Sequence, residues 1–438
     1  MSQAAPAAPQ NFRLLSFIAS APRSWFWLLC LDVYPVLVAA SIPWSTSAVS
    51  IFMVVWFVVL LPTLDLRSFL QSLKRPASLL PLTLFVLALV GMFWADSPWA
   101  VRLQGVNPVA KLLVIPFLLY HFERCQRGHW VFIAFFVSCV FLMALSWIVL
   151  FAPEWKIAAT EGAGVPLKNY IDQSQEFALC MFAAAPLLLT LIDERRPALA
   201  FACAVLLLGF FCNMMFVVIA RTAILYILVL FVVFAVTQLS RRLAIRLFAA
   251  GMAMGVLIWF TSPYLRYRVE RTVHDYNLNR DTDIATSYGE RLAYWRASMK
   301  SIAEAPVFGH GTGSTKELFD REAEGKSGEW ANSIRNPHNQ TLYVAVQWGA
   351  LGCIVLFAMW FAHLLLFRGT GLPAWVGLVV VVQNIVSSLF NSHLFDFHEG
   401  WIYVLGVGVA GGMTAGARKV VPSVSFRTPV DAPSNLDG

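Results

Sequence analysis

The stretch WVFIAFFVSCVFLMALSWIVLF, residues 130–151, contains no charged side chain in 22 consecutive positions. At a rise of 1.5 Å per residue, a helix of this length crosses the hydrocarbon core of a bilayer, which is roughly 30 Å thick. The stretch therefore predicts a membrane-spanning helix.

Similar apolar runs recur along the whole chain of 438 residues. The chain is 58% hydrophobic and only 13% charged, with a mean hydropathy of +0.67, whereas soluble domains are roughly 45–50% apolar. The pattern predicts an all-α, polytopic integral membrane protein with about twelve transmembrane helices. The expected spans are 26–42, 48–63, 78–94, 108–121, 130–151, 176–192, 197–218, 221–239, 244–263, 340–364, 372–390 and 398–416.

The basic residues predict the orientation of these spans. With the N-terminus inside, segments expected on the inner side carry sixteen Lys and Arg, whereas the short outer connections carry five. Because such residues are retained on the cytoplasmic side, we expect both termini to be cytoplasmic. The expected order is a cytoplasmic segment, nine spans, one large outer loop, three spans and a cytoplasmic tail. Their boundaries are 1–25, 26–263, 264–339, 340–416 and 417–438.

Several chemistries are disfavoured by the sequence. It contains no glycine-rich phosphate loop, no His/Cys zinc spacing and no GxSxG turn, so we expect neither a metal nor a cofactor. The net charge of +7 is better explained by membrane anchoring than by nucleic-acid binding. We expect few ionisable groups within the spans, with Asp32 and His363 as exceptions, which disfavours a transporter. The outer face is then the expected place of the chemistry.

The stretch RNPHNQTLYVAVQWGALG, residues 335–352, precedes and begins an apolar helix. Asn336 can cap this helix, and His338 then falls in its first turn, where the positive end of the helix dipole disfavours protonation. A neutral imidazole there can serve as a general base. The alternative is a histidine that only bonds the loop. Gly349 and Gly352 would let another helix pack closely.

Residues 287–306 predict a helix within the large loop. Arg291 lies in its first turn, where it can bind an anion or form a salt bridge to a neighbouring Glu. The helix can lie on the outer membrane surface. Its apolar stripe is Leu292, Trp295, Met299 and Ile302.

Arg221 lies at the outer boundary between two spans in the stretch MMFVVIARTAIL. Facing inward, its guanidinium would bind a diphosphate through two hydrogen bonds; facing outward, it would reach lipid headgroups. Four further candidates belong to the same face, the last two within the turn NSHLFDFHEG. They are Arg102, Lys168, His393 and Asp396.

At these residues the chain resembles the O-antigen ligase family, whose superfamily also contains O-antigen polymerases. The family pattern is a His-Asn pair, nine residues and Gly-x-x-Gly, which His338, Asn339, Gly349 and Gly352 fit. Arg221 is similar to the family's arginine at an outer helix start. Arg291, in an Arg-x-x-x-Trp setting, is similar to its loop arginine. The twelve spans and the large loop extend the resemblance over nearly the whole chain.

The resemblance implies a membrane glycosyltransferase of the GT-C type in the bacterial inner membrane, with its active site facing the periplasm. It would transfer O-antigen from undecaprenyl diphosphate to the lipid A–core oligosaccharide, with inversion and without a metal. His338 would be the general base, and Arg221, Arg291 and Asn339 would bind the diphosphate or substrate. The expected partners are this donor, this acceptor and membrane lipids, with no nucleic acid.

Two alternatives remain open on the sequence. An O-antigen polymerase would use the same donor but extend another lipid-linked chain. A polytopic transporter of lipid or sugar belongs to a different class and would require polar residues near the middle of the membrane.

Overall fold

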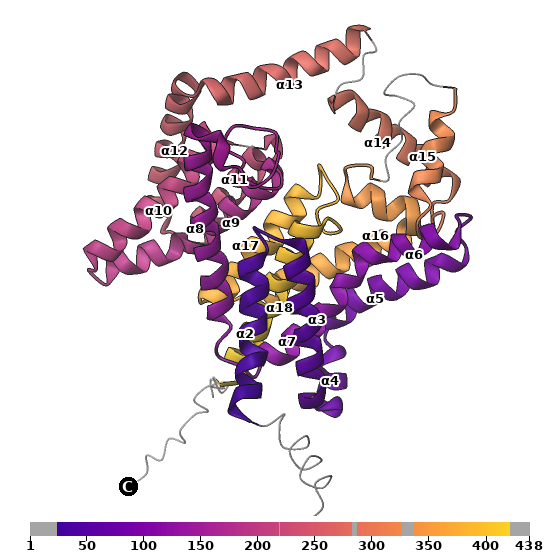
Figure 1. The fold of residues 1–438 in the computed structure, drawn as a ribbon, viewed down its shortest axis with the longest axis horizontal. Helices are drawn as coiled ribbons and strands as arrows, with labels where there is room; N and C mark the ends of the chain where they lie inside the picture. Colours follow the sequence, from indigo (N-terminus) through magenta and orange to yellow (C-terminus); the bar gives the residue numbers. More distant parts are fainter. Residues whose placement is uncertain (1–23, 219, 283–286, 326–335, 421–438) are drawn as a thin grey trace, which may run out of the picture.

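The computed structural model describes residues 24–218, 220–282, 287–325 and 336–420 (Figure 1). In these ranges the chain forms α-helices joined by loops and short 3₁₀ turns. The elements are α2 (Trp25–Ser41), α3 (Thr46–Leu60), η2 (Leu61–Thr63), α4 (Leu66–Leu73), α5 (Pro76–Val90), η3 (Gly91–Phe93), α6 (Trp99–Ala110), η4 (Lys111–Leu113), α7 (Val114–Phe122), α8 (His129–Phe151), η5 (Pro153–Trp155), α9 (Tyr170–Asp193), α10 (Pro197–Phe216), α11 (Arg221–Gln238), α12 (Arg241–Thr261), α13 (Pro263–Thr282), α14 (Ser287–Glu304), α15 (Thr315–Ala323), α16 (Gln340–Leu366), α17 (Leu372–Ser387) and α18 (Phe397–Val420).

Among the described residues, ten helical segments are long and apolar enough to cross a membrane. Two shorter apolar helices, α2 and α17, have 17 and 16 residues. Each of the twelve expected spans falls on one of these segments, so the all-α, polytopic membrane fold is confirmed. The ten long segments are Thr46–Thr63, Pro76–Phe93, Trp99–Phe122, His129–Phe151, Tyr170–Asp193, Pro197–Phe216, Arg221–Gln238, Arg241–Thr261, Gln340–Leu366 and Phe397–Lys419.

Helix α18 lies at the centre of the bundle, between α7 and α17 (Figure 1). Its contact with α7 depends on small residues. A Cβ atom added to Gly408 would lie 2.5 Å from the Cβ atom of Leu118, and one added to Gly412 would lie 2.7 Å from that of Phe122. Glycine is required here because membrane helices associate through close van der Waals contact rather than through the hydrophobic effect.

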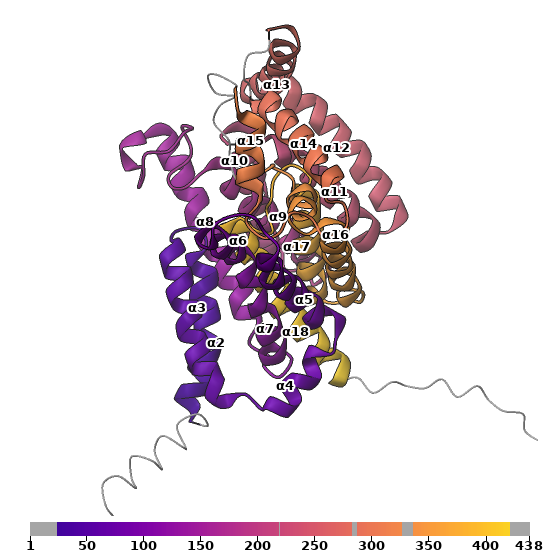
Figure 2. The same ribbon diagram turned by 90° about the vertical axis from the view of Figure 1, so that its right-hand side faces the viewer.

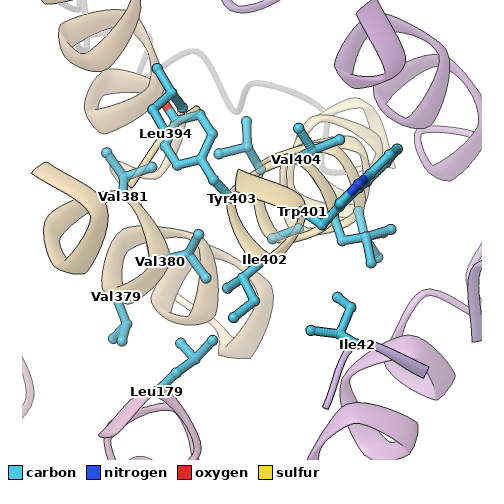
Figure 3. Packing of buried hydrophobic residues seen from close by; sticks show 14 of the residues in the cluster. Ile42, Leu179, Val379, Val380, Val381, Leu394, Trp401, Ile402, Tyr403 and Val404 are labelled. Atoms are coloured by element: carbon cyan, nitrogen blue, oxygen red, sulfur yellow. The ribbon is translucent and has the colours of Figure 1, made fainter. Parts of the chain in front are cut away.

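The packing of α17 against α18 shows the same principle with larger side chains. Figure 3 places Val380 of α17 beside Ile402 and Tyr403 of α18, and all three are buried. The Tyr403 hydroxyl lies 2.6 Å from Nδ1 of His363 on α16, so its polar end is paired inside the bundle. Unpaired polar groups are costly in a membrane interior, and this contact joins α16 to α18.

The long hydrophilic segment 264–339 contains most of α13, together with α14 and α15. Figures 1 and 2 show these helices at one end of the molecule, with α14 and α15 next to α16. The beginning of α2 and the end of α18 lie at the opposite end (Figure 1). We call the end with α13–α15 the loop end and the other the remote end.

Candidate functional site

The residues around His338 form a tight loop that is bonded to the loop after α17. His338 has a φ of 53°, which is uncommon for a residue other than glycine. Its backbone N–H donates to Oδ1 of Asn336 at 2.9 Å, and the Ser392 hydroxyl donates to the same oxygen at 2.6 Å. Oδ1 of Asn391 lies 2.9 Å from Nδ1 of His338. These bonds hold the imidazole in a fixed position at the loop end of α16.

The predicted start of α16 is wrong by three residues. The helix begins at Gln340, and its cap is Asn339, whose Oδ1 accepts from the backbone N–H of Leu342 at 3.0 Å. The Asn339 side chain also donates to the Leu389 carbonyl at 2.9 Å. Both ends of this amide are therefore used to hold the two loops together. His338 lies outside the helix because its left-handed backbone cannot continue a helical turn.

Burial is the main influence on the charge of His338. Burial lowers the pKa of its imidazole, the bond to Asn391 raises it, and the charge of Arg291 lowers it. From the sequence, the positive end of the helix dipole was expected to keep the His338 imidazole neutral. The structure gives the same direction through burial and a neighbouring guanidinium.

Arg291 and Arg221 lie close enough to interact electrostatically. Burial lowers the pKa of Arg291, the charges of Tyr170 and Glu290 raise it, and that of Arg221 lowers it. The charge of Arg291 also lowers the pKa of His338, so the three predicted residues lie within electrostatic range of one another, on α11, α14 and the loop before α16. We call Arg221, Arg291 and His338 the central group. Two guanidinium groups near one another favour an anion such as a diphosphate.

The residues that precede Arg221 hold the start of α11 in place. Val217 and Val218 are buried against Val165 of the loop before α9, and the Ala220 N–H donates to the Ser174 hydroxyl at 3.0 Å. Arg221 is the first helical residue, and Ala220 provides no side-chain cap. The amide groups at this helix end consequently favour an anion.

A set of buried or half-buried polar side chains lies beside the site, in the first two turns of α9 and the first turn of α18; we call it the polar cluster. His398 Nδ1 lies 2.8 Å from the Asp172 carboxylate, and Gln175 donates to Glu399 at 3.3 Å. Gln175 also lies 3.0 Å from Nδ1 of His393. The polar cluster consists of Asp172, Gln175, Glu176, His398 and Glu399.

Two of the four further candidates, His393 and Asp396, lie near Asp172 of the polar cluster. His393 is buried, which lowers its pKa to about 3; Asp172 raises that pKa, whereas Arg291 and His338 lower it further. Burial raises the pKa of Asp396 to about 7, although Lys111 opposes this effect. His393 therefore lies within electrostatic range of the central group as a neutral side chain.

The other two of the four further candidates, Lys168 and Arg102, donate hydrogen bonds to backbone carbonyls. Lys168 donates to the backbone carbonyl of Ile42. Arg102 donates to the carbonyls of Ser97 at 2.5 Å and Met92 at 2.8 Å, and lies over the Trp99 ring. Arg102 thus holds the turn before α6, and no contact described for it reaches the central group.

The expectation of spans with few ionisable groups is wrong. Lys111, Glu176 and Glu399 lie in the spans expected at 108–121, 176–192 and 398–416, and all three are buried. Glu176 and Glu399 lie near the start of a helix, and Lys111 lies in the 3₁₀ turn between α6 and α7. The apolar residues that follow each of them made the segment read as an uncharged span. The scarcity of charge therefore gives no reason to exclude a transporter.

Gly349 has a role different from the one predicted. It breaks α16 with φ 59° and ψ −154°, a conformation essentially restricted to glycine. The segment after α14 enters at this break: the N–H groups of His310 and Gly311 donate to the carbonyls of Val346 and Gln347 at 2.9 and 2.8 Å. The glycine therefore admits a loop rather than a helix, and this loop fixes α14, which carries Arg291.

Gly349→Ala is expected to destabilise the protein by on the order of 1–3 kcal/mol, because the backbone conformation excludes other residues. The added Cβ would also lie 2.4 Å from the Val307 carbonyl. Gly255→Ala on α12 is the control, since a Cβ there meets nothing within 4 Å. Thermal unfolding in detergent measures the difference. Equal melting temperatures for both variants would contradict the strained kink.

The most deeply buried side chains of α14 are not those of its apolar stripe. Met299 of that stripe is 59% exposed, whereas Ala297, Ser298 and Ser301 are buried. The helix contacts α13, α15 and α16, and Tyr294 stacks on Phe319 of α15. The buried side of α14 therefore carries small residues, and α14 packs against α16 as well as against α13 and α15.

A group of three side chains at the remote end has the residue types of a metal site, which sequence spacing did not predict. Asp32, His121 and Cys125 offer ligand atoms within 4.8 Å of one another. The Asp32 carboxylate, however, lies 3.1 Å from His121 Nε2, 3.0 Å from Cys125 Sγ and 3.1 Å from Arg127 Nη1. Burial raises the pKa of the Cys125 thiol to about 12. These contacts describe one carboxylate shared by three donors.

Comparison with known families adds to this geometry. A sequence model of the family described as O-Antigen ligase matches residues 203–357. This match supports membership of the O-antigen ligase family. The matched region runs from α10 into α16, and it contains Arg221, Arg291 and His338. No curated protein matches the chain. The match to this family supports a glycosyltransferase-like activity on polysaccharide and lipid-linked substrates.

Proposed function

We propose that the chain is an O-antigen ligase, which transfers polysaccharide from undecaprenyl diphosphate to the lipid A–core oligosaccharide. The observation that carries this proposal is the group of His338, Arg291 and Arg221 at the loop end of a membrane bundle. The loop end is then the periplasmic face of the bacterial inner membrane. Both termini are cytoplasmic, as the basic residues predict.

The proposed reaction is a direct displacement at the anomeric carbon of the donor. The acceptor hydroxyl oxygen forms the new bond, the bond to the diphosphate oxygen breaks, and the anomeric centre is inverted. His338 takes the hydroxyl proton. Arg291 and Arg221 stabilise the charge that develops on the leaving diphosphate, so this step needs no metal ion.

Asn391 is proposed to position the base. Asn336 Oδ1 accepts from two donors, so its Nδ2 faces Asn391 at 3.5 Å, and the oxygen of Asn391 must point to this side. An amide oxygen can only accept, so Nδ1 of His338 carries the proton in this bond. Nε2 then keeps its lone pair, and no partner is described for it among the residues that the structure covers.

Asn391→Leu is expected to reduce the turnover number by about 10- to 100-fold, because the imidazole loses the partner that fixes its tautomer. Asn391→Asp keeps the acceptor but adds a negative charge, which raises the pKa of His338. The wild-type acid limb should lie below pH 6.5, the ordinary pKa of histidine, because burial lowers the pKa of His338. In the Asp variant this limb should move to higher pH.

The pH profile of kcat/KM distinguishes positioning from a purely structural role. A structural contact would lower activity equally at all pH values in both variants. An unchanged acid limb in the Asp variant would contradict the positioning role of Asn391, even if wild-type transfer is confirmed.

A strain that lacks this chain tests ligase against polymerase. A ligase predicts lipid-linked polymer together with unmodified lipid A–core, because polymerisation continues without its acceptor step. Accumulation of lipid-linked single repeat units would instead show a polymerase. A transporter would leave the lipid-linked sugar on the other side of the membrane. Family membership favours the two transferases over the transporter.

A further inference from the structure

A cavity that is apolar throughout lies within the helix bundle. Its volume is about 460 Å³, and it lies among α8, α9, α10, α17 and α18, beside the end of α2. Each lining side chain is aliphatic, aromatic, a cysteine thiol or a glycine hydrogen. Figure 3 shows four of the lining residues, Ile42, Leu179, Val380 and Ile402, around one part of it. The volume falls in the range of about 300–1,000 Å³ of ligand pockets.

The cavity extends toward the remote end. Four lining residues are strongly exposed: Ile133 by 56%, Leu199 by 52%, and Leu187 and Leu372 by 46% each. Ile133, Leu199 and Leu372 lie within the first turns of α8, α10 and α17. Leu187 lies in the second half of α9. The cavity is therefore open to the surface between these helices, in the half of the bundle away from His338.

The cavity is separated from the candidate site by polar side chains. Leu179, Val380 and Ile402 line both the apolar cavity and a small neighbouring pocket that contains Gln175 and Glu399. Both polar residues belong to the polar cluster beside His393. A hydrocarbon chain that enters at the remote end would meet this polar wall before it reached the site.

Arginines lie next to the open end of the cavity. Arg127 precedes α8, Arg195 and Arg196 lie between α9 and α10, and Arg368 precedes α17; all four are exposed. Their neighbours include acidic groups: Arg127 bonds Asp32 at 3.1 Å, and Arg196 bonds Glu194 at 3.0 Å. Asp193 lies in the same turn. The arginines still outnumber the carboxylates, so this surface attracts anions.

We propose that the cavity binds one acyl chain of an anionic glycerophospholipid, whose phosphate lies on the arginines at the remote end. A bilayer supplies hydrocarbon chains to fill apolar space, and an unfilled cavity loses the contacts of its lining. Basic pockets between membrane helices bind anionic headgroups. The donor of the proposed reaction would place its diphosphate at Arg221 and Arg291, at the opposite end. The lipid site is therefore distinct from the donor site and does not depend on the proposed function.

Lipid binding to purified, delipidated protein tests the proposal. Native mass spectrometry with added phosphatidylglycerol or phosphatidylcholine should show one tightly bound phosphatidylglycerol. Arg195→Gln with Arg196→Gln should weaken phosphatidylglycerol binding by on the order of 5- to 25-fold, since each arginine near a headgroup contributes about five-fold. Phosphatidylcholine binding should change little. Arg241→Gln with Arg242→Gln is the matched control, because α12 does not line the cavity.

A second variant tests whether the chain enters the cavity. Ala184→Phe places a ring among the lining residues and should reduce lipid retention at least ten-fold. Thr190→Phe, at an exposed position of the same helix, should leave it unchanged. If the Ala184→Phe variant does not fold, the wild-type melting temperature should still rise with phosphatidylglycerol more than with phosphatidylcholine.

Three outcomes would overturn the proposal. Equal affinity for both phospholipids, with no effect of the arginine changes, would show that the arginines do not bind the headgroup. Unchanged lipid retention in Ala184→Phe would show that the acyl chain does not lie in the cavity. Displacement of the bound lipid by undecaprenyl phosphate, together with a raised donor KM in Ala184→Phe, would assign the cavity to the donor tail.

Discussion

His338→Ala is expected to lower glycosyl transfer by about 10²- to 10⁴-fold, the usual contribution of a positioned general base. The protein should remain folded, because the loop around residue 338 is held mainly by backbone and asparagine contacts. Glutamine at this position should be nearly as inactive, since it can hydrogen-bond but cannot accept the proton. The initial rate of transfer in proteoliposomes, at saturating donor and acceptor, measures both effects.

His129→Ala is the matched control for this prediction. His129 is exposed at the remote end and lies 3.0 Å from the carbonyl of Gln126 in its own turn. Its replacement should leave the rate within two-fold of wild type. If His338→Gln retains most of the activity, the imidazole acts by hydrogen bonding and its role as a base is wrong.

Arg291→Ala and Arg221→Ala are each expected to lower the turnover number by about 10²- to 10³-fold, because each removes a cation from the leaving diphosphate. The two changes should not be additive, since both guanidinium groups act on one charge. Lysine should restore only part of the activity at either position, because an ammonium lacks the paired geometry of a guanidinium. Single-turnover rates for the two single variants and the double variant give the coupling.

Arg296→Ala provides a control on the same helix as Arg291. Arg296 is exposed, so its loss changes the net charge of α14 without changing the site. Fully additive effects of the two site variants, or a similar loss in Arg296→Ala, would show that the arginines do not share one anion.

The spans could be predicted from the sequence because a bilayer allows few solutions. A run such as 130–151 has no charge over the length of the hydrocarbon core, and each expected span coincides with a helix. The ends were less accurate because caps decide them locally. Asn339, not Asn336, caps α16, and both residues have the same side chain.

The three residues of the central group were predicted from short patterns, and in the structure they lie within electrostatic range of one another, while their roles stay predictions. Asn391 could not be predicted in this way, because it lies 53 residues from His338 in sequence, and an asparagine in a turn has no periodicity. The kink at Gly349 was missed for a similar reason. Its inserted loop comes from residues 306–311, and sequence spacing does not show which element will fill a gap between helices.

The buried charges were overlooked because hydropathy averages over a window. Glu176 and Glu399 lie in the first two turns of their helices, so the apolar residues that follow dominate the average. The structure pairs these ends of α9 and α18 beside the site, where Gln175 donates to Glu399 at 3.3 Å.

The most direct test of the proposed function is transfer by the purified protein from undecaprenyl-diphosphate-linked polymer to purified lipid A–core, in the presence of EDTA. Wild type and His338→Ala are compared in the same proteoliposomes, with a second reaction that offers a lipid-linked chain as acceptor. We expect wild type to attach polymer to lipid A–core and the variant to attach none. Transfer only to the lipid-linked chain, or equal transfer by the variant, would contradict the assignment of a ligase centred on His338.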